Sequence, residues 1–193
     1  IGKVFGMSGD KIDEIFNNVH NESSFILAGR NATIGYSTFF ENMLSSNLQQ
    51  IIENQGKRAF ETKEQTIDET LMLDFLLRVS KTKQLMNKYG NFDGLIRTAP
   101  NGRQVLLEKA YSLVKKVIRG DYVSAADEKI VLGDSKYVYL KNASSGQQES
   151  IRILQDAFVS LYTNNKIFRV IEEPEAHIFP EAQMYLLQLL AIL

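Results

Sequence analysis

The chain has 193 residues, of which 44% are hydrophobic and 23% charged, so it can bury one core, alone or with an appended helical subdomain. Its formal net charge of −1 excludes a global electrostatic attraction to nucleic acid or to anionic membranes. The lack of cysteine excludes disulfides and thiolate metal sites and suits a reducing cytoplasm, and there is neither a signal peptide nor an apolar run of roughly 18 residues. We therefore expect a cytoplasmic protein with no membrane segment.

The N-terminal part predicts a helix followed by a strand. Apolar residues recur at helical spacing over 10–19, and 23–28 is a short apolar run that favours a buried strand ending at Gly29 and Arg30. An arginine at a strand tip is a candidate phosphate contact, although a solvated side chain leaving the strand is the commoner outcome.

Three longer helices are predicted next. The pattern is helical over about 36–55 and again over about 66–89, where Leu71, Phe75, Leu76 and Val79 form an inward stripe. Residues 90–94 and 100–102 are rich in glycine, asparagine and proline and predict turns. A helix follows, with Leu106, Ala110, Leu113, Val114 and Val117 on one face, and it ends at Gly120.

A basic and aromatic cluster lies at the end of the second helix. Tyr89, Phe92 and the pair Lys81 and Lys83 are candidate contacts for nucleic acid. The alternative is an ordinary solvated helix face, which mixed charges and aromatics form in most proteins.

The C-terminal third predicts a hairpin, a helix, a strand and a second helix. Strand-like runs over 126–132 and 135–140 flank Gly133 and Asp134, a two-residue hairpin signal of the Gly-first kind. The helix over 146–162 has Ile151, Leu154 and Phe158 on one face, and the last helix follows the strand and a proline.

Two short motifs in this third carry the functional signal. Residues 144–148, Ser-Ser-Gly-Gln-Gln, form a small-residue turn that opens a helix and aims unpaired backbone N–H groups at one point, as an anion site requires. Taken alone, the same residues also fit a plain N-cap, with Ser144 or Ser145 as the cap and Glu149 in the first turn. Residues 167–175 form an apolar strand, expected to be buried, that delivers Glu172 and Glu173 to its C-terminal tip.

Together, in this order and spacing, the two motifs resemble the signature loop and Walker B strand of ABC-type ATPases. The resemblance is closest to the RecF/SMC-like and AAA-type bacterial ATPases that carry the ending E-E-P-E-A-H-x-x-P. It implies an α/β fold of the P-loop NTPase, ABC-like type with a helical insertion subdomain. Residues 1–35 then belong to the ATPase core, 36–120 to the helical insertion, and 121–193 to the signature hairpin and helix, the Walker B strand and the following helix.

The resemblance also implies roles for the two carboxylates, with ATP and Mg²⁺ as cofactors. Glu172 takes the Walker B position, where aspartate is more usual, and would hold Mg²⁺, whereas Glu173 would be the catalytic carboxylate that polarises the attacking water. Consecutive strand residues point to opposite faces, so both side chains reach one site only if the strand ends at Glu172 and the chain turns at Glu173, as Pro174 favours.

The signature turn is implied to act on a second copy of the chain. Ser144, Gly146 and Gln147 match the family pattern, while Ser145 departs from it. Ser144 and the N–H groups of Gly146 and Gln147 would bind the γ-phosphate of ATP held by the opposite subunit of an ATP-dependent homodimer. Glu175 and His177 would then lie in the loop that contacts the partner, an assignment that we prefer to a nuclease-type metal site formed by Glu173, Glu175 and His177.

One element of the family is missing from the sequence. No G-x-x-x-x-G-K-[ST] phosphate loop occurs among the 193 residues, so we expect this chain to be part of a longer protein that supplies it. Relatives act in DNA repair or phage defence, which makes DNA and a nuclease possible partners. The alternative is a non-catalytic module, a dimerisation or nucleotide-gated scaffold.

Overall fold

The computed structural model describes residues 22–30, 67–100, 102–124 and 127–193. The helices predicted over 10–19 and 36–55 lie outside these ranges. Within them, the chain combines helices with two small sheets, in agreement with the predicted α/β class.

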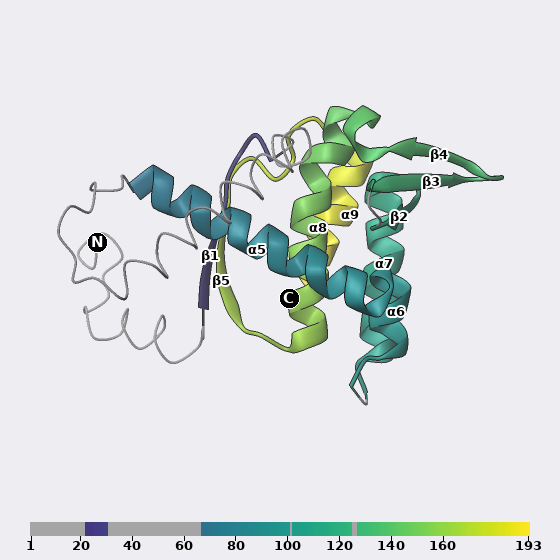
Figure 1. The fold of residues 1–193 in the computed structure, drawn as a ribbon, viewed down its shortest axis with the longest axis horizontal. Coiled ribbons are helices and arrows are strands. Elements are labelled where there is room, and N and C mark those ends of the chain that lie inside the picture. Colours follow the sequence, from purple (N-terminus) through teal and green to yellow (C-terminus); the bar gives the residue numbers. More distant parts are fainter. Residues whose placement is uncertain (1–21, 31–66, 101, 125–126) are drawn as a thin grey trace, which may run out of the picture.

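The first sheet pairs two strands that are far apart in the sequence. Strand β1, Glu22–Ile26, lies parallel to β5, Ile167–Ile171, with Ile26 opposite Ile171, so both C-terminal tips meet at one corner (Figure 1). The prediction that β5 is buried is wrong. Phe168 and Val170 are 37% and 41% exposed, because β1 is the only described strand that pairs with β5 and the side chains of β5 alternate between its two faces.

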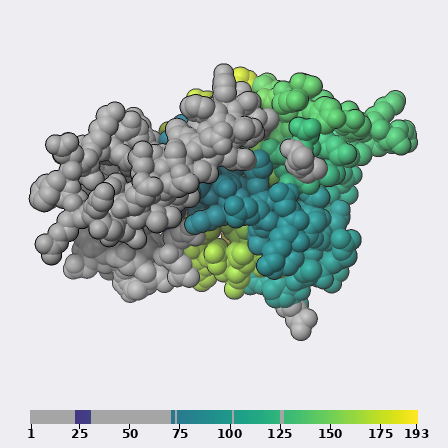
Figure 2. Space-filling model, in the orientation of Figure 1, coloured from purple at the N-terminus to yellow at the C-terminus, as the bar shows by residue number. Residues whose placement is uncertain are grey.

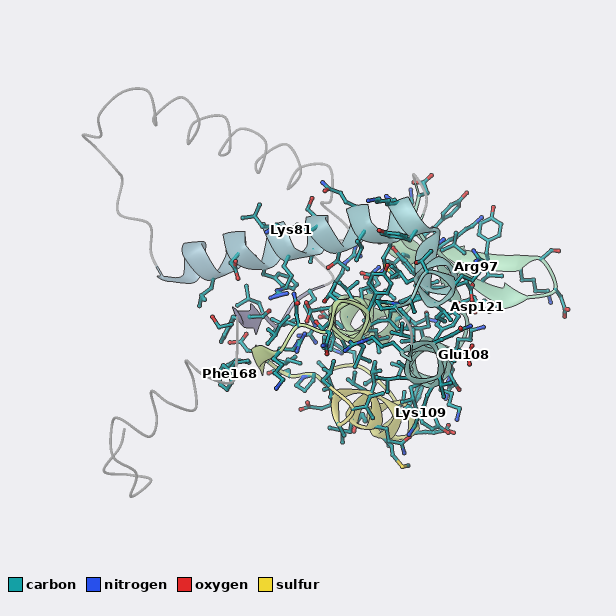
Figure 3. All side chains as sticks on the ribbon, turned by 90° about the horizontal axis from the view of Figure 1, so that it is seen from below. Lys81, Arg97, Glu108, Lys109, Asp121 and Phe168 are labelled. Atoms are coloured by element: carbon teal, nitrogen blue, oxygen red, sulfur yellow. The ribbon has the colours of Figure 1, made fainter. Side chains whose placement is uncertain are left out.

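Five helices build the body of the described structure. They are α5 Ile67–Tyr89, α6 Asn91–Arg97, α7 Gln104–Ile118, α8 Ser145–Thr163 and α9 Pro180–Leu190. Figure 3 shows α7, α8 and α9 nearly end-on, with α5 crossing over them and α8 between α5 and α9. Their apolar faces share one core, and the inner stripe predicted for α7 is buried there except for the partly exposed Leu106.

The second sheet is an antiparallel meander that leads into α8. Strand β2, Asp121–Val123, pairs with β3, Lys129–Gly133, which pairs with β4, Lys136–Tyr139; a short 3₁₀ helix, Leu140–Asn142, follows. The β3–β4 hairpin projects from the body (Figures 1 and 2). Its turn lies one residue later than predicted, because Asp134 and Ser135 both take positive φ, 46° and 62°, and Gly133 remains in the strand.

The stretch predicted as turns at residues 90–94 contains helix α6. A Cβ on Gly94 would lie 1.4 Å from the carbonyl oxygen of Tyr89, so the glycine permits α6 to pack directly against the end of α5. Phe92 is fully buried and its ring centroid lies 4.8 Å from that of Phe158 on α8 and 5.1 Å from that of Tyr111 on α7. Phe92 is therefore a core residue and not a contact for nucleic acid.

Two ion-pair clusters fix α8 to its neighbours. In the first, Asp156 accepts from Arg78 of α5 at 3.2 Å and from Arg169 of β5 at 2.7 Å. In the second, Glu128 at the start of the hairpin accepts from both terminal nitrogens of Arg152, at 2.7 and 2.8 Å. Burial raises the pKa of Glu128, but the Arg152 guanidinium outweighs this and lowers that pKa to about 2. Helix α8 is thus held by charge as well as by apolar packing.

Candidate functional site

The signature turn, residues 144–147, begins helix α8 with a complete capping box. Ser144 is the N-cap, in extended conformation, and its Oγ accepts from the N–H of Gln147 at 3.3 Å. The Gln147 side chain accepts in return from the N–H of Ser144 at 3.1 Å. Ser144 is therefore the cap, in place of the alternative Ser145, and Gln147 closes the box without Glu149.

This geometry decides which donors the turn offers. The N–H of Gln147, one of the groups expected to meet a phosphate, is already bonded to Ser144. The N–H groups of Ser145 and Gly146 occupy the first helical positions, where an α-helix provides no internal acceptor. The Gln147 side chain also donates to the carbonyl of Ile118 at 2.7 Å, which fixes the turn to the end of α7. The turn is a rigid helix N-terminus with exposed serines and positive dipole character.

The acidic turn, residues 172–177, follows β5. The strand ends at Ile171, and Glu172 continues from it by donating its N–H to the carbonyl of Ile26 at 2.9 Å. Its side-chain Oε2 accepts from the N–H of Ala28 at 3.0 Å. Glu173 then takes a left-handed φ of 42°, a conformation that costs an L-residue roughly 1–2 kcal/mol. The chain therefore turns at Glu173, which is the condition for both carboxylates to serve one site.

Arg30 packs against this turn and is 1% exposed. Its guanidinium donates to four carbonyl oxygens: Leu27 at 2.8 Å, Glu149 at 2.9 Å, Glu172 at 2.7 Å and Glu173 at 3.1 Å. Burial lowers the pKa of Arg30, and the carboxylates of Glu149, Glu173 and Glu172 oppose that shift. Neither interpretation offered for Arg30 is right, because it is not solvated and its donors point at the protein's own backbone.

The signature turn and the acidic turn are in direct contact. A Cβ on Gly146 would lie 2.3 Å from the carbonyl oxygen of His177, so only a glycine allows the start of α8 to approach the acidic turn this closely. His177 has a φ of 61°, and the side chains of Glu172, Glu173, Glu175 and His177 are exposed. The structure thus brings the start of α8 into contact with the acidic turn, near the tips of β1 and β5.

This corner combines a helix N-terminus, which attracts anions, with exposed carboxylates, which attract cations. A helix N-terminus favours a phosphate oxygen, and carboxylate oxygens such as those of Glu172 and Glu173 are the ligands that Mg²⁺ prefers. No group of three or more His, Asp or Glu side chains with metal-site geometry occurs among the residues that the structure describes. Of the residues that the structure describes at this corner, Arg30 is a buried cation, and its guanidinium donates to carbonyl oxygens.

Sequence reasoning missed one participating residue, Glu149, and one contact, made by Gly146. Glu149 is 4% exposed; its Oε2 accepts from the N–H of Arg30 at 2.9 Å and lies 3.5 Å from its Nε. The available signal was weak: Glu149 lies one helical turn before Ile153 but away from the face of Ile151, Leu154 and Phe158, and only its burial in the fold shows that this carboxylate requires a partner. The close approach at Gly146 had no signal in the sequence.

Comparison with known proteins gives one match. The family model described as AAA ATPase domain matches residues 8–193. Searches of curated proteins and of solved structures returned no significant match. Across the described ranges, no helix has both the length and the apolar character needed to cross a membrane.

Proposed function

Because this chain belongs to the AAA ATPase domain family, we propose that it binds and hydrolyses ATP as one half of a composite site of the ABC/RecF-like type. In this proposal two copies of the chain form an ATP-dependent homodimer. Each copy supplies the acidic turn to its own nucleotide and the signature turn to the nucleotide of its partner. Helices α5 to α7 belong to the helical insertion.

The contact between the two turns is the observation that carries the proposal. Gly146 packs on the carbonyl of His177, and the acidic turn bends at Glu173, so a helix N-terminus and two exposed carboxylates lie at one surface. Carboxylates near a helix N-terminus interact favourably with its dipole, and they also compete with any free anion that would bind there. ATP brings its own divalent cation, so in the dimer the acidic turn would meet the Mg²⁺ of the chain's own nucleotide, and the signature turn would meet the γ-phosphate of the partner's.

Each residue then has a defined task. Glu172 would hold Mg²⁺, an ion that would supply charge neutralisation for the phosphates. Glu173 accepts a hydrogen bond from the attacking water and orients it toward the γ-phosphorus. Ser144 and the N–H groups of Ser145 and Gly146 donate to γ-phosphate oxygens of the partner's ATP, where negative charge spreads during transfer. The phosphate loop is supplied from outside these 193 residues.

The test is Glu173→Gln in the full-length protein. The amide keeps the size of the side chain but does not attract a water proton, so ATP affinity should stay within about 3-fold while kcat falls on the order of 100-fold or more. The matched control is Glu108→Gln, an exposed glutamate on α7 that is labelled in Figure 3 and lies away from the corner. Unchanged turnover in Glu173→Gln would contradict the assignment, and nucleotide binding without any turnover in the unmutated protein would favour the scaffold alternative.

A further inference from the structure

The Arg30 side chain donates hydrogen bonds to both peptide groups that flank Glu173. Its Nη1 donates to the carbonyl of Glu172, which precedes Glu173, and its Nη2 donates to the carbonyl of Glu173 itself. The orientation of these two peptide planes sets the φ and ψ of Glu173 and hence the direction of its side chain. A planar guanidinium can hold two carbonyls in one fixed geometry, which a lysine ammonium cannot do.

The conformation that Arg30 holds is one that Glu173 would not keep alone. Its φ of 42° lies in the left-handed region, which L-residues with a Cβ avoid. Strained backbone of this kind persists only where the surrounding structure fixes it. The surrounding contacts here are the two bonds from Arg30 and the bond from the N–H of Ala176 to the Glu173 carbonyl, at 3.0 Å.

Arg30 also connects the acidic turn to helix α8. Its Nε donates to the carbonyl of Glu149 and its backbone N–H donates to the Glu149 carboxylate, both at 2.9 Å. Glu149 lies in the early part of α8, close to the cap that presents the signature turn. A displacement of α8 is therefore transmitted to the carbonyls around Glu173 through one buried side chain. The packing of Gly146 on His177 is a second contact between the same two segments.

We propose that Arg30 and Glu149 are positioning residues that hold Glu173 in its catalytic conformation and connect it to the signature helix of the same chain. This inference rests on the proposed function. In the composite dimer, the acidic turn serves one nucleotide and the signature turn of the same chain serves the other. The Arg30–Glu149 pair therefore couples the two sites of the dimer, because closure of α8 on the partner's ATP fixes the carboxylate that acts on the chain's own ATP.

The first test needs no nucleotide. Hydrogen exchange of the full-length protein is compared with that of Arg30→Lys, which keeps the positive charge but loses the planar fork. The amides of Glu172 and Ala176, which are hydrogen-bonded in the acidic turn, should exchange about 10-fold faster or more, while those of α7 stay unchanged. Arg97→Lys, an exposed arginine on α6 labelled in Figure 3, is the matched control. Unchanged exchange at the acidic turn would overturn the proposal.

The second test separates positioning from nucleotide contact. Arg30→Lys should lower kcat about 10- to 100-fold, because small displacements of a catalytic group are costly, and leave the KM for ATP within about 3-fold. A raised KM at constant kcat would mean that Arg30 contacts the nucleotide and would overturn the proposal. Glu149→Gln keeps the size of the side chain and removes its charge, so it should lower kcat less than Arg30→Lys does, again with little change in the KM for ATP. It replaces Arg30→Lys if that variant does not fold.

The two proposals fail in different ways. If Glu173→Gln retains full turnover, the catalytic assignment is wrong, yet exchange at the acidic turn still reports whether Arg30 holds it. If Glu173→Gln is inactive while Arg30→Lys shows unchanged exchange and kcat, the ATPase proposal stands and the positioning role is wrong.

Discussion

Gly146→Ala adds a single methyl group where the signature turn meets the acidic turn. Built on the present backbone, its Cβ would lie 2.3 Å from the carbonyl oxygen of His177, 2.9 Å from Cγ2 of Ile178 and 3.0 Å from the carbonyl carbon of His177. Two of these atoms belong to the backbone, so no side-chain rotation relieves the clash. Gly146 is not among the residues of positive φ, so alanine suits its backbone conformation and the effect is purely steric.

The magnitude follows from two opposing terms. Overpacking a well-packed contact costs about 1–3 kcal/mol. Alanine in place of glycine in a helix returns up to about 1 kcal/mol, and less at the second helical position. We therefore expect Gly146→Ala to lower the free energy of unfolding by about 1–2 kcal/mol. It should also lower kcat for ATP, because the acidic turn must shift away from α8.

Urea denaturation followed by circular dichroism measures the stability change, and a steady-state ATPase assay measures the rate. Ser145→Ala is the matched control for the stability measurement alone, because Ser145 is the exposed neighbour in the same helical turn, and its free energy of unfolding should stay within about 0.5 kcal/mol of the unmutated value. A Gly146→Ala protein that is as stable and as active as the unmutated one would refute the contact between the two turns.

Two further predictions concern the body that supports the site. Phe92→Ala removes the centre of the buried aromatic cluster and should lower the free energy of unfolding in urea by about 3–5 kcal/mol, whereas Val105→Ala, at a residue 78% exposed, should stay within about 0.5 kcal/mol. Glu128 has its pKa lowered from 4.5 to about 2 in the folded chain, so its stabilising effect is complete above pH 4.5 and is lost as pH falls toward 2. The loss is on the order of 3 kcal/mol, and Glu128→Gln should flatten this part of the curve of stability against pH, whereas an unflattened curve would contradict the assignment.

The long elements could be predicted because their signal is local. Hydrophobic periodicity places α5, α7 and α8 close to their observed bounds, and the apolar run at 167–171 predicts β5. The capping box is equally local, since Ser144 and Gln147 are three residues apart and both side chains are polar.

The errors come from contacts between distant residues. Glycine at 94 predicts a break, yet here its lack of a side chain lets α6 pack on Tyr89. Arg30 looks like a solvated residue because its carbonyl partners lie 119 and more positions away, apart from Leu27. The resemblance selected the residues of the two turns, but only the fold reveals that Arg30 and Gly146 connect these turns within one chain.

The central claim is that two copies of this chain share each ATP site, and a mixing experiment tests it most directly. Ser144→Arg blocks the signature turn and Glu173→Gln disables the carboxylate, so each variant alone should be inactive. In a heterodimer, the carboxylate of the first variant meets the signature turn of the second and rebuilds one site of the two. An equilibrated equimolar mixture should recover about one quarter of the unmutated ATPase rate if the sites act independently. A verified heterodimer with no activity above that of the separate variants would contradict independently acting shared sites, and would leave either strict coupling of the two sites through α8 or a wrong assignment of Ser144.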